Sequence, residues 1–264
     1  MKFIKMQAAG NDYIYVVGGE EKEDYPALSQ KYSDRRFGIG GDGIITVSPS
    51  TVADAKMRIF NADGSEGLTC GNGVRCAAYL AKKYLGVNGG KISVNTLSGT
   101  TYSVVETLSP SSAFVTADFC SPHPFASGEI LAAEYLKAGL YIDKRDIFGI
   151  NTGNLHVVCF SGISVDELRD FTEKIPLLQG KVNVETVRET DGGILAEVSE
   201  RGSGKTLSCG SGAVASAYSY FLRSGNASGG VAVFMPGGEL GVKISGGRAF
   251  LSGKVEEVFK GETL

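Results

Sequence analysis

Two cysteines in this 264-residue chain stand where thiol chemistry is altered. Cys70 opens the motif C-G-N-G, Cys209 opens C-G-S-G, and an apolar-periodic helix is predicted after each. A helix N-terminus carries partial positive charge and unpaired N–H groups, and both favour a thiolate. Because the glycines leave these N–H groups uncovered, each motif also predicts a site for an anion, and an α-amino acid carboxylate suits it.

The remaining titratable residues offer few alternatives to these two thiols. The chain has no C-x-x-C, and its two histidines make a histidine-built metal site unlikely, so we expect no metal. Cys76, Cys120 and Cys159 are interpreted as structural, because a cytosolic cysteine is by default a small buried hydrophobe. A cysteine–histidine nucleophile needs a base, and only His156 is a candidate.

The chain repeats itself. Residues 60–86 and 199–225 align over 27 positions without a gap, and each has a polar residue nine positions before its cysteine, Asn61 in one and Glu200 in the other. A second pair of similar segments surrounds Asn11 and Asn154. The halves are therefore duplicates offset by about 140 residues. Two tandem copies with separate sites are one interpretation; we favour one site in a shared cleft, with a cysteine on each face of the substrate Cα.

Alternating apolar residues indicate the elements that position these motifs. Strands are predicted at 3–6, 13–17, 43–48, 56–61, 91–96, 101–107, 113–119, 155–160, 182–187, 194–200, 231–236 and 248–253. Helices are predicted at 24–36, 70–86, 163–178 and 209–225. A Pro/Ser-rich stretch at 120–128 places the linker near 116–120. We expect two α+β domains, 1–117 carrying Cys70 and 118–253 carrying Cys209, related by a pseudo-twofold axis.

Composition excludes several classes of protein. Hydrophobic residues make up 42% and charged residues 21% of the chain, which is enough for a buried core. The net charge of −3 provides no basic excess for nucleic acid or an anionic membrane. No apolar run approaches the roughly 20 residues that span a bilayer, and the N-terminus lacks a signal-peptide pattern. We therefore expect a cytoplasmic protein with a small-molecule partner.

Six segments together resemble the diaminopimelate epimerase family, and the resemblance spans nearly the whole chain. They lie at residues 1–16, 36–47, 57–76, 151–158, 200–213 and 235–240. The resemblance implies two similar domains, each a curled sheet around a central helix, with a C-terminal strand at 254–264 returning to the first domain. It implies interconversion of LL- and meso-diaminopimelate without pyridoxal phosphate or another cofactor, and a homodimer.

The resemblance also implies a role for each matching residue. Cys70 and Cys209 resemble the two acid/base residues, one thiolate abstracting a proton while the other thiol donates one. Backbone N–H groups of Gly71, Asn72, Gly210 and Ser211 would bind the reacting carboxylate. The family's polar pocket is matched by Asn11, Asn61, Asn154, Glu200 and Arg201. Arg201 can bind a distant carboxylate bidentately, Glu200 can accept from an ammonium, and His156 either orients a cysteine or is structural.

Two departures from the family pattern bear on the substrate. Leu155 replaces the usual proline in G-N-P-H, which loosens the turn that positions Asn154. Where many family members read N-V-N-F or N-V-E-F, this chain reads N-V-E-T at residues 183–186. Glu185 stands where it can touch the distal end of the substrate, and its carboxylate would suit a cation. A related racemase acting on another amino acid, such as histidine, is therefore an alternative. Arg201 favours diaminopimelate, and retention of both cysteines disfavours a catalytically silent relative.

Overall fold

The computed structural model describes residues 1–18 and 23–264, and the chain divides into two compact units. The first comprises residues 1–118 and 252–264, and the second comprises residues 119–251. The chain therefore leaves the first unit once and returns to it near its C-terminus, in strand β17 (Arg248–Glu262).

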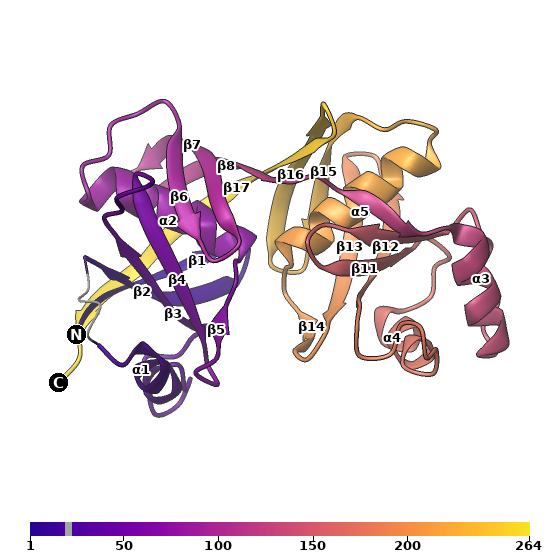
Figure 1. Cartoon of the computed structure of the whole chain (residues 1–264), viewed down its shortest axis with the longest axis horizontal. Helices are drawn as coiled ribbons and strands as arrows, with labels where there is room; N and C mark the ends of the chain where they lie inside the picture. The colour runs from indigo at the N-terminus through magenta and orange to yellow at the C-terminus, as the bar shows by residue number, and fades with distance from the viewer. Residues whose placement is uncertain (19–22) are drawn as a thin grey trace. The chain divides into compact units, whose positions relative to one another are not determined.

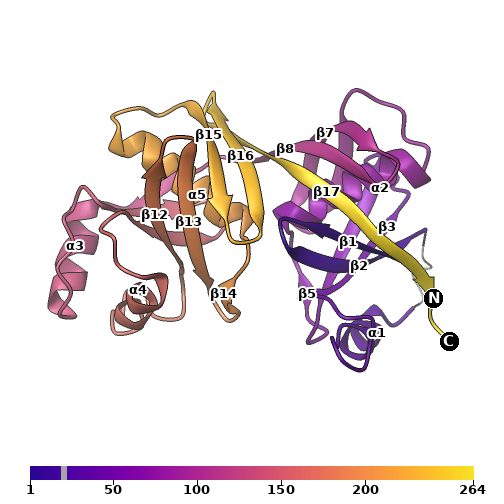
Figure 2. The same cartoon turned by 180° about the vertical axis from the view of Figure 1, so that it is seen from behind.

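The first unit is a closed ring of strands. Successive pairings run β17–β1–β2–β3–β4–β6–β7–β8, and β8 pairs in turn with β17. Figure 2 shows β17 lying alongside β1. A ring has no unpaired edge, so each of these eight strands has a neighbour on both sides, while the short β5 pairs with β4 beside the ring. The strands of this unit are β1 (Lys2–Ala8), β2 (Asn11–Val17), β3 (Gly43–Ser48), β4 (Ala55–Asn61), β5 (Glu66–Gly67), β6 (Ile92–Thr96), β7 (Gly99–Ser109) and β8 (Ser112–Cys120).

Helix α2 (Gly71–Tyr84) occupies the interior of this ring, as Figure 1 shows. Eleven of its fourteen residues are buried, and its apolar side chains form one core with residues of the surrounding strands. Small residues such as Ala77, Ala78 and Ala81 let the strands approach the helix closely. Helix α1 (Tyr25–Tyr32) lies against β3 and β4 outside the ring.

The second unit repeats this arrangement. Helix α5 (Gly210–Arg223) contacts β10, β11, β12, β13, β15 and β16, and nine of its fourteen residues are buried. Helices α3 (Gly128–Lys137) and α4 (Val165–Thr172) belong to a separate core cluster with β10–β12 residues. The strands are β9 (His123–Ala126), β10 (Ile147–Asn151), β11 (Leu155–Cys159), β12 (Asn183–Thr190), β13 (Gly193–Glu200), β14 (Gly204–Thr206), β15 (Gly229–Met235) and β16 (Gly238–Ser245).

The pairing pattern shows the duplication directly. In the first unit, β2 and β3 are parallel and joined through α1, and β4 and β6 are parallel and joined through α2. In the second unit, β11 and β12 are parallel and joined through α4, and β13 and β15 through α5. Each unit therefore contains two parallel crossovers in the same order. The fold class expected from the sequence, two duplicated halves with a sheet curled around a central helix, is confirmed.

Element boundaries differ from expectation in several places. The two cysteine helices begin one residue later and end two residues earlier than predicted, and α4 is half the predicted length. Helix α3 was not predicted, although Ser127 caps it and Leu131 and Tyr135 form its buried i, i+4 pair. Strands β5, β9, β10, β14 and β16 were also missed, and β9 lies within the Pro/Ser-rich stretch at 120–128. In the described parts of the chain, no helix is both long and apolar enough to cross a membrane.

The enclosed helix should dominate the stability of the first unit. Leu80 on α2 is fully buried, so Leu80→Ala should lower the free energy of unfolding by about 2–5 kcal/mol through lost burial and a cavity. Leu97, in the β6–β7 turn, is 56% exposed, and Leu97→Ala should change it by less than about 0.5 kcal/mol. Urea unfolding of both variants measures the difference. Equal urea midpoints for Leu80→Ala and Leu97→Ala would show that α2 does not form the core of this unit.

Candidate active site

Cys70 is the N-cap of α2. Its backbone is extended (φ −144°, ψ 121°), and its Sγ accepts a hydrogen bond from the Gly73 N–H at 3.4 Å. The first-turn amides of a helix have no acceptor within the helix, so the capping sulfur takes one of them. A Cβ on Gly73 would lie 2.8 Å from Ile45 Cδ1, so glycine lets the first turn of α2 pack closely against β3 without moving the Ile45 side chain.

Two of the predicted asparagines lie at strand ends in this unit. Asn11 begins β2, and its Oδ1 accepts a hydrogen bond from the Cys70 thiol at 3.5 Å. Asn61 ends β4, and its Nδ2 donates to Ser65 Oγ at 3.0 Å in the turn before β5. Asn11 therefore contacts Cys70 directly. Asn61 instead contacts Ser65, in the turn between β4 and β5.

A buried guanidinium lies on the same helix. Arg75 is fully buried, and its Nη2 donates to Asn72 Oδ1 at 2.9 Å. Burial lowers the pKa of Arg75, while the acidic groups of Cys76, Cys70 and Tyr15 act in the opposite direction. Arg75 thus fixes the side chain of Asn72, whose backbone belongs to the predicted anion site, and it places a positive group among the thiols of this unit.

Cys209 caps α5 in the same way. Its backbone is extended (φ −132°, ψ 115°), and its Sγ accepts from the Gly212 N–H at 3.4 Å. Burial, followed by the carboxylates of Glu200 and Glu185, raises the pKa of the Cys209 thiol well above its usual range. Hydrogen bonds from Ser211 and Gly212 only partly oppose this rise. Burial and these two carboxylates therefore favour the protonated form of Cys209, contrary to the expectation that the helix N-terminus favours a thiolate at this position.

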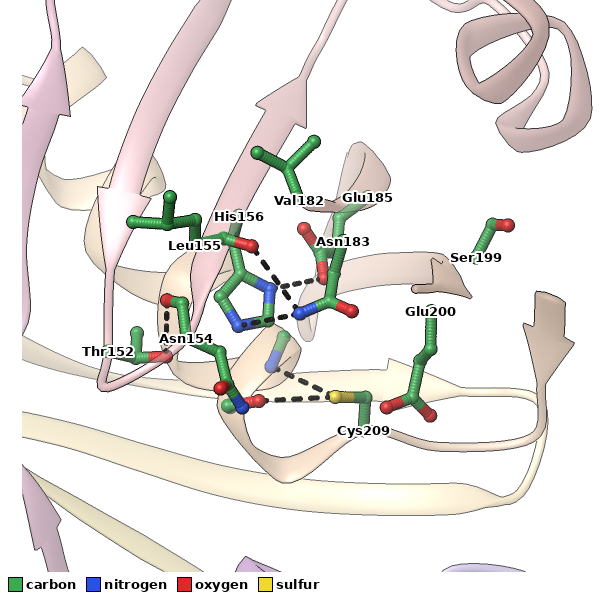
Figure 3. A network of polar contacts seen from close by, with 12 residues as sticks. Thr152, Asn154, Leu155, His156, Val182, Asn183, Glu185, Ser199, Glu200 and Cys209 are labelled. Carbon is green, nitrogen blue, oxygen red and sulfur yellow. Dashed lines mark hydrogen bonds and ion pairs between the residues drawn. The ribbon is translucent and has the colours of Figure 1, made fainter. Parts of the chain in front are cut away.

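His156 and Glu185 form a buried pair beside Cys209, shown in Figure 3. Neither side chain is exposed, and His156 Nδ1 donates to Glu185 Oε1 at 2.7 Å. Asn183 Nδ2 lies 3.5 Å from His156 Nε2, so the amide donates to that nitrogen and the ring proton is assigned to Nδ1. A Cβ on Gly212 would lie 2.6 Å from Glu185 Oε1, which places this carboxylate against the first turn of α5.

The other predicted residues of the second unit lie at its strand ends. Glu200 ends β13, the position equivalent to Asn61, and accepts from Thr206 Oγ1 at 2.6 Å. Arg201 follows with an exposed side chain, and its backbone N–H donates to Asn183 Oδ1 at 2.9 Å. Asn154 is exposed in the turn before β11. That turn lacks proline, and a bond from Thr152 N–H to the Asn154 carbonyl helps to close it.

Two residues outside the predicted set connect these groups. Asn183 contacts Leu155, His156 and Arg201, and Asp42 contacts Asn11. Asn183 begins β12, which pairs in parallel with β11, and Asp42 immediately precedes β3, which pairs in parallel with β2. The only signal in the sequence is a polar residue at the beginning of an apolar run. Among the described residues, no group of three or more His, Cys, Asp or Glu is placed to hold a metal.

This arrangement defines a class of protein with two duplicated barrels, each presenting a thiol and helix N–H groups at one end of its enclosed helix. Solved structures share the fold. A PhzF-family phenazine biosynthesis protein from Bacillus anthracis matches with TM-score 0.74 and 17% identity over 100% of this chain and 99% of its own. A hydroxyproline epimerase from Agrobacterium vitis matches with TM-score 0.64 and 13% identity over 99% and 91%.

Sequence comparisons identify the family. The family model for diaminopimelate epimerase matches residues 3–111. A diaminopimelate epimerase from Caldanaerobacter subterraneus is 38% identical over 99% of both chains. Another from Desulfitobacterium hafniense is 35% identical over 100% of this chain and 98% of its own. The chain therefore belongs to the diaminopimelate epimerase family and is an epimerase, as its resemblance to that family implies.

The carboxylate of Glu185 should control the reactivity of Cys209. Glu185→Gln removes one of the negative charges that raise the pKa of this thiol, so more thiolate should exist at pH 8. Alkylation of Cys209 by iodoacetamide, followed by peptide mass spectrometry, should become roughly three- to tenfold faster. The control is Glu197→Gln on the same unit, where the carboxylate pairs with Lys205. An unchanged alkylation rate of Cys209 in Glu185→Gln would show that Glu185 does not raise the pKa of this thiol.

Proposed function

We propose that this protein interconverts LL- and meso-diaminopimelate by proton transfer at Cα, with Cys70 and Cys209 as the two acid/base groups. The observation that carries the proposal is the duplicated cap: each cysteine is the N-cap of an enclosed helix and takes the N–H of the third residue after it at 3.4 Å. Full-length relatives named diaminopimelate epimerase support this substrate.

The substrate's reacting carboxylate would bind at the helix N-termini. After the capping sulfur has taken the N–H of Gly73 or Gly212, the preceding amides, of Gly71 and Asn72 and of Gly210 and Ser211, still point out of the helix end. Removing the α-proton moves negative charge onto the carboxylate, and fixed N–H groups stabilise it more in the transition state than in the ground state. In this proposal, one substrate carbon lies between both cysteines.

The proton steps balance without an external base. One cysteine, as thiolate, takes the proton from Cα and becomes a thiol, while the other gives its proton to the opposite face and becomes a thiolate. The reverse reaction starts from the opposite protonation state. The raised pKa of Cys209 supports its role as the donor in one direction. His156 and Glu185, buried beside it, would tune this thiol rather than touch the substrate.

The distal end of the substrate would be bound by the second unit. Arg201 has an exposed guanidinium, while its backbone is held by Asn183, so it can form a bidentate pair with a second carboxylate. Glu200 at the preceding position can accept from an ammonium. Asn11, Asn61 and Asn154 supply further amide groups. A substrate with a carboxylate and an ammonium at each end fits these charges, whereas histidine has no second carboxylate for Arg201.

Substitution of either cysteine tests the mechanism. Cys70→Ser and Cys209→Ser should each reduce epimerisation by several orders of magnitude, because a serine hydroxyl is too weak an acid to form the required anion near neutral pH. In heavy water, early turnover by the parent should place deuterium at Cα of the product and leave recovered substrate unlabelled. Circular dichroism checks that the variants are folded.

Two results would contradict the two-thiol proposal. One is full activity in either serine variant, and the other is label entering substrate as fast as product, which a single shared base produces. A racemisation screen of diaminopimelate and the twenty amino acids, without added cofactor, separates mechanism from substrate. Preference for histidine would retain the chemistry and replace the substrate.

Arg201→Ala tests the distal anchor. Loss of a charge-assisted partner for a carboxylate costs about 1.5–3 kcal/mol, so KM for diaminopimelate should rise roughly ten- to hundredfold. The turnover number should change less, since in this proposal Arg201 binds the end of the substrate that is remote from the reacting Cα. Arg188→Ala is the matched control, because Arg188 is also an exposed arginine of this unit. Parental KM in Arg201→Ala would exclude Arg201 as the anchor.

A further inference from the structure

We propose that Asp42 is a positioning residue that locks the Asn11 side chain with its carbonyl oxygen toward Cys70. The Asp42 carboxylate accepts a hydrogen bond from Asn11 Nδ2 at 2.6 Å, and Asn11 Oδ1 accepts one from Cys70 Sγ at 3.5 Å. A carboxylate has no hydrogen to donate, so Asn11 can present only its N–H₂ to Asp42. The functional meaning of this lock rests on the proposed role of Cys70.

Asp42 is itself held from several sides. Its Oδ2 also accepts from the Asp12 backbone N–H at 3.1 Å, and its Oδ1 accepts from Arg35 Nη2 at 3.0 Å. Its backbone N–H donates to the Asp12 carbonyl at 2.7 Å, and its carbonyl accepts from the Ala62 N–H at 3.1 Å. Asp42 therefore ties the start of β2 to the turn that follows Asn61, and its carboxylate cannot rotate without breaking three bonds.

Ion pairs surround Asp42 and the start of β2. Asp12 pairs with Lys5 Nζ at 2.6 Å and with Arg35 Nη2 at 2.6 Å. Burial alone would raise the pKa of Asp12, but the hydrogen bonds and charges of Arg35 and Lys5 outweigh it and lower the pKa. Two cations thus face two carboxylates at the start of β2 and β3. The neutral Asn11 amide is the group through which this charged cluster reaches Cys70.

The fixed orientation of the Asn11 amide determines which groups it can hydrogen-bond. With its oxygen fixed toward the sulfur, Asn11 accepts a hydrogen bond from a thiol and disfavours a thiolate, whereas a flipped amide would donate to a thiolate. The same fixed oxygen can accept from the α-ammonium of a substrate. Asp42 therefore keeps Asn11 an acceptor, so that the Cys70 thiol has a hydrogen-bond acceptor until a substrate ammonium takes its place on Asn11 Oδ1.

The second unit has no equivalent lock. Strands β3 and β12 start at the duplicated positions Gly43 and Asn183, so Val182 stands where the first unit has Asp42. Asn154, the counterpart of Asn11, is exposed, and Figure 3 draws no contact to its amide from Val182. The lock is therefore a property of the Cys70 half alone.

Two variants separate hydrogen bonding from charge. Asp42→Ala and Asp42→Asn both remove the negative charge, but only Asp42→Asn retains an oxygen that can accept from Asn11 Nδ2. The groups facing Cys70, namely Arg75, Cys76 and Tyr15, are unchanged in both. Asp54→Asn is the control, because that carboxylate of the same unit bonds to Ser93 and has no hydrogen bond to Asn11.

The readout is alkylation of Cys70 by iodoacetamide between pH 6 and 9, followed by peptide mass spectrometry in the absence of substrate. In Asp42→Ala, the freed amide should donate to the thiolate, so alkylation at pH 7.5 should be roughly three- to tenfold faster. Epimerase kcat/KM should fall about tenfold or more. Asp42→Asn should stay within about threefold of the parent in both measurements, and Asp54→Asn should match the parent.

Repeating Asp42→Ala in an Asn11→Ala background completes a double-mutant cycle. If Asp42 acts through Asn11, the change in alkylation should disappear there. Equal effects of Asp42→Ala and Asp42→Asn, or an effect that persists without Asn11, would overturn the lock. The alkylation assay needs no turnover, so it tests the lock even if the protein does not epimerise diaminopimelate. If the parent epimerises diaminopimelate but Asp42→Ala leaves the alkylation rate of Cys70 unchanged, the proposed role of Asp42 is wrong and the proposed function stands.

Discussion

The enclosure of a helix within a ring of strands is the constraint on which each half of this protein depends. The ring can cover the sides of α2 and α5, but the N–H groups of the first turn have no acceptor within the helix and must find another partner. The end of the helix is therefore where polar chemistry is possible. A cysteine cap accepts a hydrogen bond from one of these N–H groups and leaves its sulfur beside the other first-turn N–H groups. Cys70 and Cys209 therefore cap the helix and also place a thiol at the proposed anion site.

Duplication preserved the scaffold while the polar groups diverged. Ile45 packs against Gly73 in the first unit, and Glu185 occupies the equivalent place against Gly212 in the second. Tyr13, the counterpart of His156, lies in the apolar core of the first unit, whereas His156 bonds to Glu185. Conversely, Arg75 is buried on α2, and Val214 occupies its place on α5. One thiol thus lies near a cation and the other near carboxylates.

The sequence predicted the features that are local. A cysteine followed by glycine-rich turns, repeated at equal spacing, marks helix caps without knowledge of the fold. It could not predict contacts created by the sheet: Asp42 meets Asn11 only because β2 and β3 pair in parallel across a helical crossover. Asn183 reaches His156 through the same kind of register between β11 and β12. Glu185 was expected to touch the substrate, and its burial against His156 followed from the inward-facing side of β12.

Divergence between the halves has a chemical reason under the proposed mechanism. Two identical thiols would share one proton equally, yet each direction of reaction needs one thiolate and one thiol. The fold cannot change the helix caps without losing the anion site, so differences must come from residues around them. Glu185 and Glu200 favour the protonated form of Cys209 by charge. Asn11, oriented by Asp42, favours the protonated form of Cys70 by a hydrogen bond that a substrate ammonium can displace. The carboxylates beside Cys209 stay in place throughout turnover, whereas the hydrogen bond from the Cys70 thiol to Asn11 can be replaced by one from a substrate ammonium. Under the proposed mechanism, binding of that ammonium would leave Cys70 as the thiol that more easily gives its proton to solvent, and the resulting Cys70 thiolate would be the base in the direction in which Cys209 donates.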